Sequence, residues 1–172
     1  DQRMELIDGA LYDMAAPTGI HQLIGGEIYA VLRDYIRTQK GKCLPMYAPI
    51  DVQLDCDEKT IVQPDVLILC DVSNFSGNKI VGAPDFIVEI LSPSTRKKDM
   101  FIKLEKYMTA GVREYWMVDV EKKKVLIYDF EHENYPILFG FDTEVPVGIF
   151  EGQCKVDFGE IYEYLRSFSL VD

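Results

Sequence analysis

Apolar residues follow two different spacings along this chain, one typical of helices and one typical of strands. From Ile20 to Thr38 they recur every three to four positions, which predicts a long amphipathic helix. A second helical pattern follows Ser92-Pro93-Ser94-Thr95, a stretch that offers a strand stop and an N-cap, and it ends at Gly111, a residue that suits a helix C-terminus. Three helices are predicted in total, over residues 20–38, 96–110 and 158–165.

Strands are predicted where apolar residues alternate or cluster between turn residues. Asp8-Gly9 is a strong hairpin signal because glycine accepts a positive φ, and it separates two short strands within Met4–Met14. Residues 47–54 and 61–70 are expected to form two adjacent antiparallel strands joined by a polar turn. Later strands are predicted over residues 86–91, 115–119 and 124–130, the last two as a hairpin around the basic run 122–124.

This order of elements favours an α/β or α+β fold, with a mixed central sheet flanked by helices and with additional β-hairpins. The 172 residues, of which 48% are hydrophobic and 27% charged, suit a single domain over residues 1–172. No segment approaches the roughly 20 unbroken apolar residues of a membrane span, and the sequence from Asp1 shows no basic-then-apolar leader. We therefore expect a soluble, cytoplasmic protein whose first residues have been trimmed.

Cysteines and histidines restrict the kinds of metal site that the chain can form. The cysteines have no CxxC spacing and no histidine nearby in sequence, so we expect reduced residues that serve mostly in packing. The only histidines are His21 and His132, which excludes a multi-histidine site. A metal would be held mainly by oxygen, and this favours a hard ion such as Mg²⁺, with Mn²⁺ as its substitute. The four cysteines are Cys43, Cys56, Cys70 and Cys154.

The charge balance is strongly acidic, with 18 Lys and Arg against 29 Asp and Glu and a formal net charge of -11. Such a charge opposes non-specific binding to polyanions, so a nucleic-acid function requires a local basic surface. The best candidate for such a surface is a basic cluster on and before the second predicted helix. A nucleic-acid interface and an ordinary solvated helix face explain this cluster equally well. That surface consists of Arg96, Lys97, Lys98, Lys103 and Lys106.

Glu89 is the most informative residue, because it lies within the apolar run Phe86–Leu91. An ionised carboxylate removed from water costs several kcal/mol unless it is neutralised, paired or bound to a cation. The period of two in a strand places Glu89 on the same face as Ile87 and Leu91, so it does not point to solvent among polar neighbours. A buried ion pair with a lysine or arginine is the structural alternative to a metal ligand.

Asp65 follows Pro64, a residue that a sheet tolerates only at a strand start or edge, so Asp65 is expected near a strand end. One strand and a loop separate it from the strand of Glu89. The two carboxylates could therefore meet across the sheet and hold a divalent cation. Turn chemistry is the structural alternative for Asp65 taken alone.

Three further side chains could reach this pair. Lys103 is expected at the border of the apolar stripe of the second helix, although an ion pair with Asp99 one turn away explains it as well. Glu27 interrupts an apolar face of the first helix, and His21 begins that helix as a capping residue or a substrate contact. The stripe itself is expected to contain Met100, Phe101, Leu104, Tyr107 and Met108.

Several motifs, in their order along the chain, resemble the bacterial Uma-type family of restriction endonucleases. Gln63-Pro64-Asp65-Val66 and the block from Gly82 to Thr95, which contains Glu-Ile-Leu-Ser-Pro-Ser-Thr, are the most specific. They are followed by Asp99, Lys103 and Tyr107, and by the stretch from Ala110 to Asp119. Leu6–Gly9 and His21 also match, so the resemblance covers most of the chain.

That family resembles a branch of the PD-(D/E)XK nuclease superfamily, which implies a restriction-endonuclease-like core. The resemblance implies that Asp65 is the aspartate of the PD element and Glu89 the acidic residue of (D/E)XK. We expect these two catalytic residues to bind the metal, with the Ile90 carbonyl as a further ligand. The sequence departs from the pattern at Leu91, where the superfamily has lysine, and Lys103 is the candidate replacement. Glu27 and His21 would then support the site.

The function expected from these residues is Mg²⁺-dependent hydrolysis of DNA phosphodiester bonds. Two alternatives stay open: a non-catalytic module of nuclease fold that binds proteins or scaffolds an assembly, and a metal-dependent hydrolase of a small phosphoester. A homodimer is also considered, because nucleases that cut both strands often pair. The aromatic segment from Tyr135 to Phe141 is its candidate interface.

Overall fold

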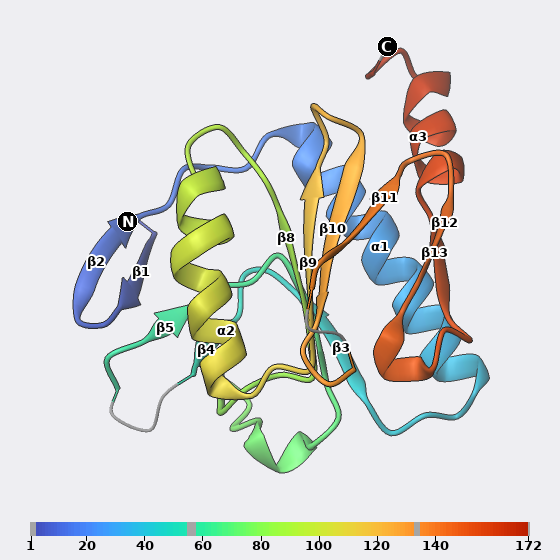
Figure 1. Ribbon diagram of the computed structural model, residues 1–172. Coiled ribbons are helices and arrows are strands. Elements are labelled where there is room, and N and C mark those ends of the chain that lie inside the picture. The colour runs from blue at the N-terminus through green and yellow to red at the C-terminus, as the bar shows by residue number, and fades with distance from the viewer. Residues whose placement is uncertain (1–2, 55–57, 133–134, 172) are drawn as a thin grey trace.

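The computed structural model describes residues 3–54, 58–132 and 135–171, and its centre is a six-stranded sheet (Figure 1). The strands are ordered β11-β10-β9-β8-β6-β3. β8 and β9 run parallel and the other neighbours run antiparallel, so the predicted mixed sheet is confirmed. The six strands are β3 (Leu44–Tyr47), β6 (Val66–Leu69), β8 (Phe86–Ile90), β9 (Glu114–Asp119), β10 (Lys124–Asp129) and β11 (Ile137–Gly140).

Helices cover both faces of this sheet, with α1 (Gly19–Thr38) on one side and α2 (Leu104–Ala110) on the other (Figure 1). The N-cap of α1 is Thr18, whose side chain accepts a hydrogen bond from the backbone of His21. Gly111 ends α2 in the left-handed conformation, as predicted. The third helix, α3 (Phe158–Ser167), follows the small hairpin of β12 (Glu144–Pro146) and β13 (Lys155–Asp157).

Strand β8 separates two hydrophobic cores, because its side chains alternate between the faces of the sheet. Phe86, Val88 and Ile90 belong to the core beneath α1, and Ile87 and Leu91 to the core beneath α2. The predicted division of this strand into two faces is therefore confirmed.

A second sheet, β2-β1-β5-β4-β7, lies beside the first, and its existence corrects one prediction. The expected strands over 47–54 and 61–70 are each broken in two, and both change sheet at a proline. The Ala48-Pro49 peptide bond is cis, and Pro64 lies between β5 and β6. The predicted antiparallel pairing survives between β4 and β5. The strands of this sheet are β1 (Met4–Ile7), β2 (Ala10–Asp13), β4 (Asp51–Gln53), β5 (Ile61–Val62) and β7 (Lys79–Val81).

The prediction that the cysteines are reduced is wrong for two of them. Cys43 and Cys70 form a disulfide, because the register that pairs Leu44 with Leu69 places them opposite one another at the end of β3 and β6. Cys154 is free and buried, as expected for a packing residue, and Cys56 lies outside the described residues.

The buried stripe predicted for the second helix is wrong in part: Tyr107 is buried and Met100 and Leu104 pack against the core, but the other two members do not. Phe101 and Met108, assigned to its buried stripe, are 67% and 52% exposed, whereas Asp99 and Lys103 are buried. The cause is local, since residues 98–103 form a π-helix whose wider turn rotates the following residues relative to an α-helix. As a result, Asp99, Lys103 and Tyr107 face the sheet. In the described part of the chain, no helix has the length and apolar content of a membrane span.

Candidate active site

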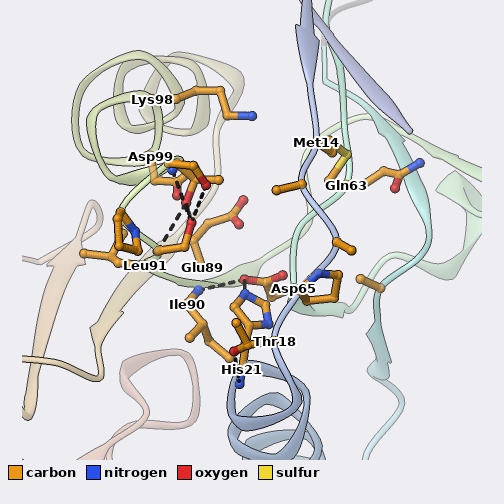
Figure 2. A pocket seen from close by; sticks show the side chains of 18 of the residues that line it. Met14, Thr18, His21, Gln63, Asp65, Glu89, Ile90, Leu91, Lys98 and Asp99 are labelled. Atoms are coloured by element: carbon orange, nitrogen blue, oxygen red, sulfur yellow. Dashed lines mark hydrogen bonds and ion pairs between the residues drawn. The ribbon is translucent and has the colours of Figure 1, made fainter. Parts of the chain in front are cut away.

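A cavity of about 510 Å³ opens at the carboxyl end of β8, between the start of α1 and the loop that leads to the π-helix (Figure 2). The segment Met14–Thr18 forms one wall, and the loop Leu91–Thr95 forms another. Its ionisable lining includes Glu5, His21, Asp65, Glu89, Lys98, Asp99 and Lys103. The structure thus brings four of the five predicted site residues to one place.

The pairing of β6 with β8 sets the positions of the two predicted metal ligands. Val66 pairs with Val88 in an antiparallel register, so the next step along both strands places Asp65 beside Glu89. Asp65 Oδ2 accepts a hydrogen bond of 2.7 Å from the backbone N–H of Ile90. The expectation that these carboxylates come from adjoining strands is confirmed.

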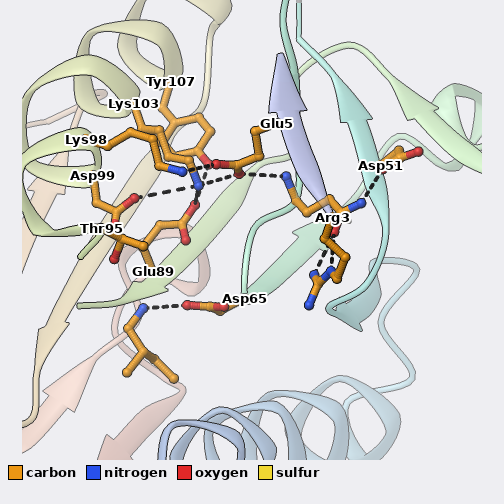
Figure 3. Close-up of polar contacts among 12 residues, drawn as sticks. Arg3, Glu5, Asp51, Asp65, Glu89, Thr95, Lys98, Asp99, Lys103 and Tyr107 are labelled. Atoms are coloured by element: carbon orange, nitrogen blue, oxygen red, sulfur yellow. Dashed lines mark hydrogen bonds and ion pairs between the residues drawn. The ribbon is translucent and has the colours of Figure 1, made fainter. Parts of the chain in front are cut away.

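Glu89 is 4% exposed and has a strongly held carboxylate. Its Oε1 accepts from Lys103 Nζ at 2.8 Å and from Tyr107 Oη at 2.6 Å. Burial raises the pKa of Glu89 well above its ordinary value, and the nearby carboxylates of Asp99 and Asp65 raise it further, while the Lys103 ammonium opposes them. Figure 3 shows the Glu89 carboxylate between Lys103 and Asp65.

Lys103 lies deeper than predicted, since it is 2% exposed rather than at the border of the buried face. Its Nζ is 2.6 Å from Glu5 Oε1, 2.8 Å from Glu89 Oε1 and 3.7 Å from Asp99 Oδ1. Burial alone lowers the pKa of Lys103, but these carboxylates more than offset it and raise the pKa, so the amine is held as ammonium. The predicted pair with Asp99 is the longest of the three contacts.

His21 lies in the first turn of α1, and its Nε2 is 3.1 Å from Asp65 Oδ2. Burial lowers the pKa of His21, but the hydrogen bond and charge of Asp65, together with the Ile90 backbone, raise it overall. Its Nδ1 is buried without a hydrogen-bond partner in the described part of the chain. His21 therefore contacts the predicted ligand Asp65 rather than serving only at the helix cap.

Glu27 does not join this group, and a different glutamate does. Glu27 is half-buried on α1 and does not line the cavity. Glu5, which drew no attention in the sequence, is 1% exposed on β1 and contacts Lys103. The sequence did not distinguish its face because apolar residues occupy both sides of the strand Met4–Ile7.

The predicted basic surface around the second helix is largely neutralised by acidic partners. Arg96 pairs with Asp119 and with Glu121. Lys98 pairs with Glu5 at 2.5 Å, and Lys106 pairs with Asp8. Lys97 is the one exposed member of this set, so these residues do not form a strip of unpaired cations along the helix.

The described residues do not contain a group of three or more His, Cys, Asp or Glu side chains arranged to hold a metal ion. The arrangement at the cavity is instead two neighbouring carboxylates, Asp65 and Glu89, with an ammonium group at one side and an imidazole at the other. Such a set can bind a cation only together with water or substrate oxygen atoms.

Two proteins are similar to this chain, one in structure and one in sequence. A crystal structure from Anabaena variabilis, described as "a putative nuclease belonging to DUF820", superposes with a TM-score of 0.77 and 20% identity, over 94% of this chain and 90% of that one. This similarity shows that the two chains share a fold. A protein of Synechocystis sp., described as uncharacterised, is 23% identical over 134 residues, which are 77% of this chain and 67% of that protein.

The family comparison extends over nearly the whole chain. The model of the Uma2 family, described as "Putative restriction endonuclease", matches residues 1–152. This span includes both sheets, α1, α2 and every residue of the cavity. It confirms the family resemblance drawn from the motifs around Asp65 and Glu89, and the description points to a nuclease. The chain belongs to the Uma2 family.

Proposed function

We propose that this protein is a Mg²⁺-dependent endonuclease that hydrolyses phosphodiester bonds of DNA, with an active site of the PD-(D/E)XK type. One observation carries the proposal: Asp65, Glu89 and Lys103, which come from three different elements, converge on a single cavity. The Uma2 family description supports nuclease activity. The superfamily type, the metal and the DNA substrate are parts of the proposal.

The residues of the cavity fit a hard divalent cation. The lining contains the five carboxylates of Glu5, Asp65, Glu89, Asp99 and Glu121 against the cationic groups of Arg3, Lys98 and Lys103 and the imidazole of His21. This excess of negative charge favours a bound cation. Mg²⁺ is commonly held by one or two carboxylates with water and substrate phosphate oxygens, so two neighbouring ligands suffice. Asp65 and Glu89 would hold the ion, with the Ile90 carbonyl beside them.

A bound Mg²⁺ supplies a Lewis acid for the scissile phosphate and lowers the pKa of a water molecule. Lys103, held as an ammonium, offsets phosphate charge and orients the attacking water. Tyr107 remains protonated because burial raises its pKa, so it stays a hydrogen-bond donor to Glu89. His21 donates to Asp65 and fixes the orientation of that carboxylate.

The departure at Leu91 has a structural explanation. Leu91 is 9% exposed and packs in the core beneath α2, so a lysine at this position would have to bury its stem and ammonium among apolar side chains or displace them. Lys103 reaches Glu89 from the π-helix instead. In this proposal Lys103 takes the role that the superfamily pattern gives to a lysine two positions after the acidic residue, although Lys103 comes from a different element.

A non-catalytic module of the same fold is the second candidate function, and the burial of Lys103 favours it. Lys103 contacts two carboxylates within 2.8 Å, as expected of a structural ion-pair network as well as of a catalytic amine. Such a module would keep these contacts and bind neither Mg²⁺ nor DNA.

Cleavage of supercoiled plasmid with Mg²⁺ or Mn²⁺ tests the proposal. We expect nicked and linear products, and we expect EDTA and Asp65→Asn each to abolish them while the circular dichroism spectrum is unchanged. Bis(p-nitrophenyl) phosphate separates DNA cleavage from hydrolysis of small phosphoesters. Hydrolysis of that compound with intact plasmid would favour the small-substrate hydrolase, and no metal-dependent cleavage of either would refute the proposal.

A further inference from the structure

Glu5 is buried at the cavity, although it belongs to a different sheet from the residues of the candidate active site. The N-terminal hairpin carries it: β1 pairs with β5, which precedes β6 in the chain, and Glu5 contacts lysines of the π-helix. Figure 3 shows Glu5 directed at Lys98 and Lys103 from the opposite side to Glu89. No prediction from the motifs assigned a role to it.

Each oxygen of the Glu5 carboxylate has a fixed partner. Oε1 lies 2.6 Å from Lys103 Nζ and accepts a hydrogen bond of 3.0 Å from the backbone N–H of Gln63. Oε2 lies 2.5 Å from Lys98 Nζ. Gln63 directly precedes Pro64-Asp65, so this one carboxylate is bonded both to the amine and to the segment that carries the metal ligand Asp65.

The ammonium of Lys103 has three N–H donors, and its position depends on their acceptors. Glu89 and Glu5 are within 2.8 Å, whereas Asp99 at 3.7 Å is beyond hydrogen-bonding distance. A Glu89 carboxylate that also binds a cation is a weaker anchor for an ammonium, because the two positive groups compete for its charge. Glu5 is then the acceptor that keeps the amine in place.

We propose that Glu5 is a positioning residue, which holds the Lys103 amine at the edge of the cavity while Glu89 binds the cation. This inference rests on the proposed nuclease function and extends it, since it assigns the N-terminal hairpin to the active site. Glu5 acts only through Lys103 and does not touch the substrate. Removing its charge should therefore reduce turnover without weakening substrate binding.

A double-mutant cycle on turnover separates this role from a purely structural one. Hydrolysis of bis(p-nitrophenyl) phosphate with Mn²⁺ gives kcat and KM for the unaltered chain, Glu5→Gln, Lys103→Met and the double variant. We expect Glu5→Gln to lower kcat about 10- to 100-fold, the range typical of outer-shell residues at metal sites. KM should change less than about twofold, and Glu5→Gln should lower kcat less than about twofold further when Lys103 is already methionine.

Asp8→Asn is the matched control, because it makes the same carboxylate-to-amide change on the same hairpin. Asp8 pairs with Lys106 outside the cavity, so this variant should keep the kcat of the unaltered chain. Urea unfolding of the unaltered chain, the two single variants at Glu5 and Lys103 and the double variant gives a readout that does not require activity. The losses of unfolding free energy caused by Glu5→Gln and Lys103→Met should be non-additive. If Glu5→Gln does not fold, Glu5→Asp replaces it. Aspartate keeps the charge at a shorter reach, so this variant should lower kcat by less than the roughly 10- to 100-fold expected for glutamine.

The possible results separate this inference from the proposed function. Equal losses of kcat from Glu5→Gln in both backgrounds, or a rise in KM with kcat unchanged, would overturn the positioning role and leave the nuclease proposal standing. Additive unfolding effects would also overturn it. No hydrolysis by the unaltered chain, of this compound or of plasmid, would overturn the nuclease proposal and the inference with it.

Discussion

Two buried glutamates lie on the adjacent parallel strands β8 and β9, and their surroundings differ. The register pairs Glu89 with Met117 near one end of the strands, and Glu114 with Phe86 at the other. Both are almost fully buried, with 4% and 1% of their surface exposed. Glu89 contacts an ammonium group and lines a cavity, whereas Glu114 does neither among the residues that the structure describes.

Glu114 is satisfied by neutral donors from the protein. Trp116 Nε1 donates to its Oε1 at 2.6 Å, and the backbone N–H of Ile149 donates to its Oε2 at 2.9 Å. The contact with Ile149 joins β9 to the turn that follows β12, which is a structural function. Burial of a carboxylate therefore does not by itself identify an active site; a charged partner and an open cavity distinguish Glu89.

The largest expected difference between the two positions is in activity. Glu89→Gln should lower Mg²⁺-dependent plasmid cleavage by at least about 10³-fold, because an amide is a poor ligand for the cation. Glu114→Gln is the matched control, and this variant should cleave plasmid at a rate within about twofold of the unaltered chain. Equal losses in the two variants would mean that cleavage depends on the fold alone.

The stability of the folded protein should depend on Lys103, the counterion of the buried Glu89. Lys103→Met leaves Glu5 and Glu89 buried without their shared ammonium, so we expect a loss of about 3–5 kcal/mol in the free energy of unfolding near neutral pH. Urea denaturation monitored by Trp116 fluorescence measures it. A loss below about 1 kcal/mol would show that the network contributes little to the folded state.

The contribution of Glu114 to the free energy of unfolding should change with pH in a defined direction. Burial raises the pKa of Glu114 above its ordinary value of 4.5, despite the hydrogen bonds that it accepts. A raised pKa in the folded state means that stability is fully present below the unfolded pKa and is lost as pH rises through the folded pKa. The unaltered chain should therefore lose stability relative to Glu114→Gln as pH rises from about 4.5, as urea unfolding at several pH values would measure. A constant difference would contradict this.

The smallest expected effect is a loss of stability from an ion pair near the cavity. Arg96 makes a two-point contact with Asp119, which ties the loop after β8 to the end of β9. Although burial raises the pKa of Asp119, the hydrogen bonds from Arg96 and Lys122 lower it overall, so the stability from this pair should be lost as pH falls through that pKa. Asp119→Asn should cost about 1 kcal/mol at neutral pH by thermal unfolding. A cost that is the same in acid would argue against the ion pair.

Much of the fold could be predicted because local periodicity and turn residues determine it. The hairpin at Asp8-Gly9, the long helix from Ile20 and the alternation along Phe86–Leu91 are local patterns, and the structure confirms them. The second sheet could not be predicted, since two prolines redirect the chain between sheets and local spacing does not show where it goes. The disulfide of Cys43 and Cys70 likewise depends on strand register.

The site was predictable where a residue conflicted with its local pattern. Glu89 is a carboxylate in an apolar strand, and Asp65 follows a proline, so both stand out in the sequence. Lys103 was expected at the edge of its helix because the π-helix, which turns it inward, has no simple sequence signal. Glu5 lies in a strand with apolar residues on both faces, so only the tertiary structure distinguishes it.

Calorimetric titration with Mn²⁺ tests the central claim most directly, because it asks whether the pair of Asp65 and Glu89 binds a cation at all. We predict one saturable binding event for the unaltered chain and for Glu114→Gln, and we predict its loss in Asp65→Asn and Glu89→Gln. No binding to the unaltered chain, or equal binding by all four proteins, would contradict the account and leave Glu89 as a structural ion pair.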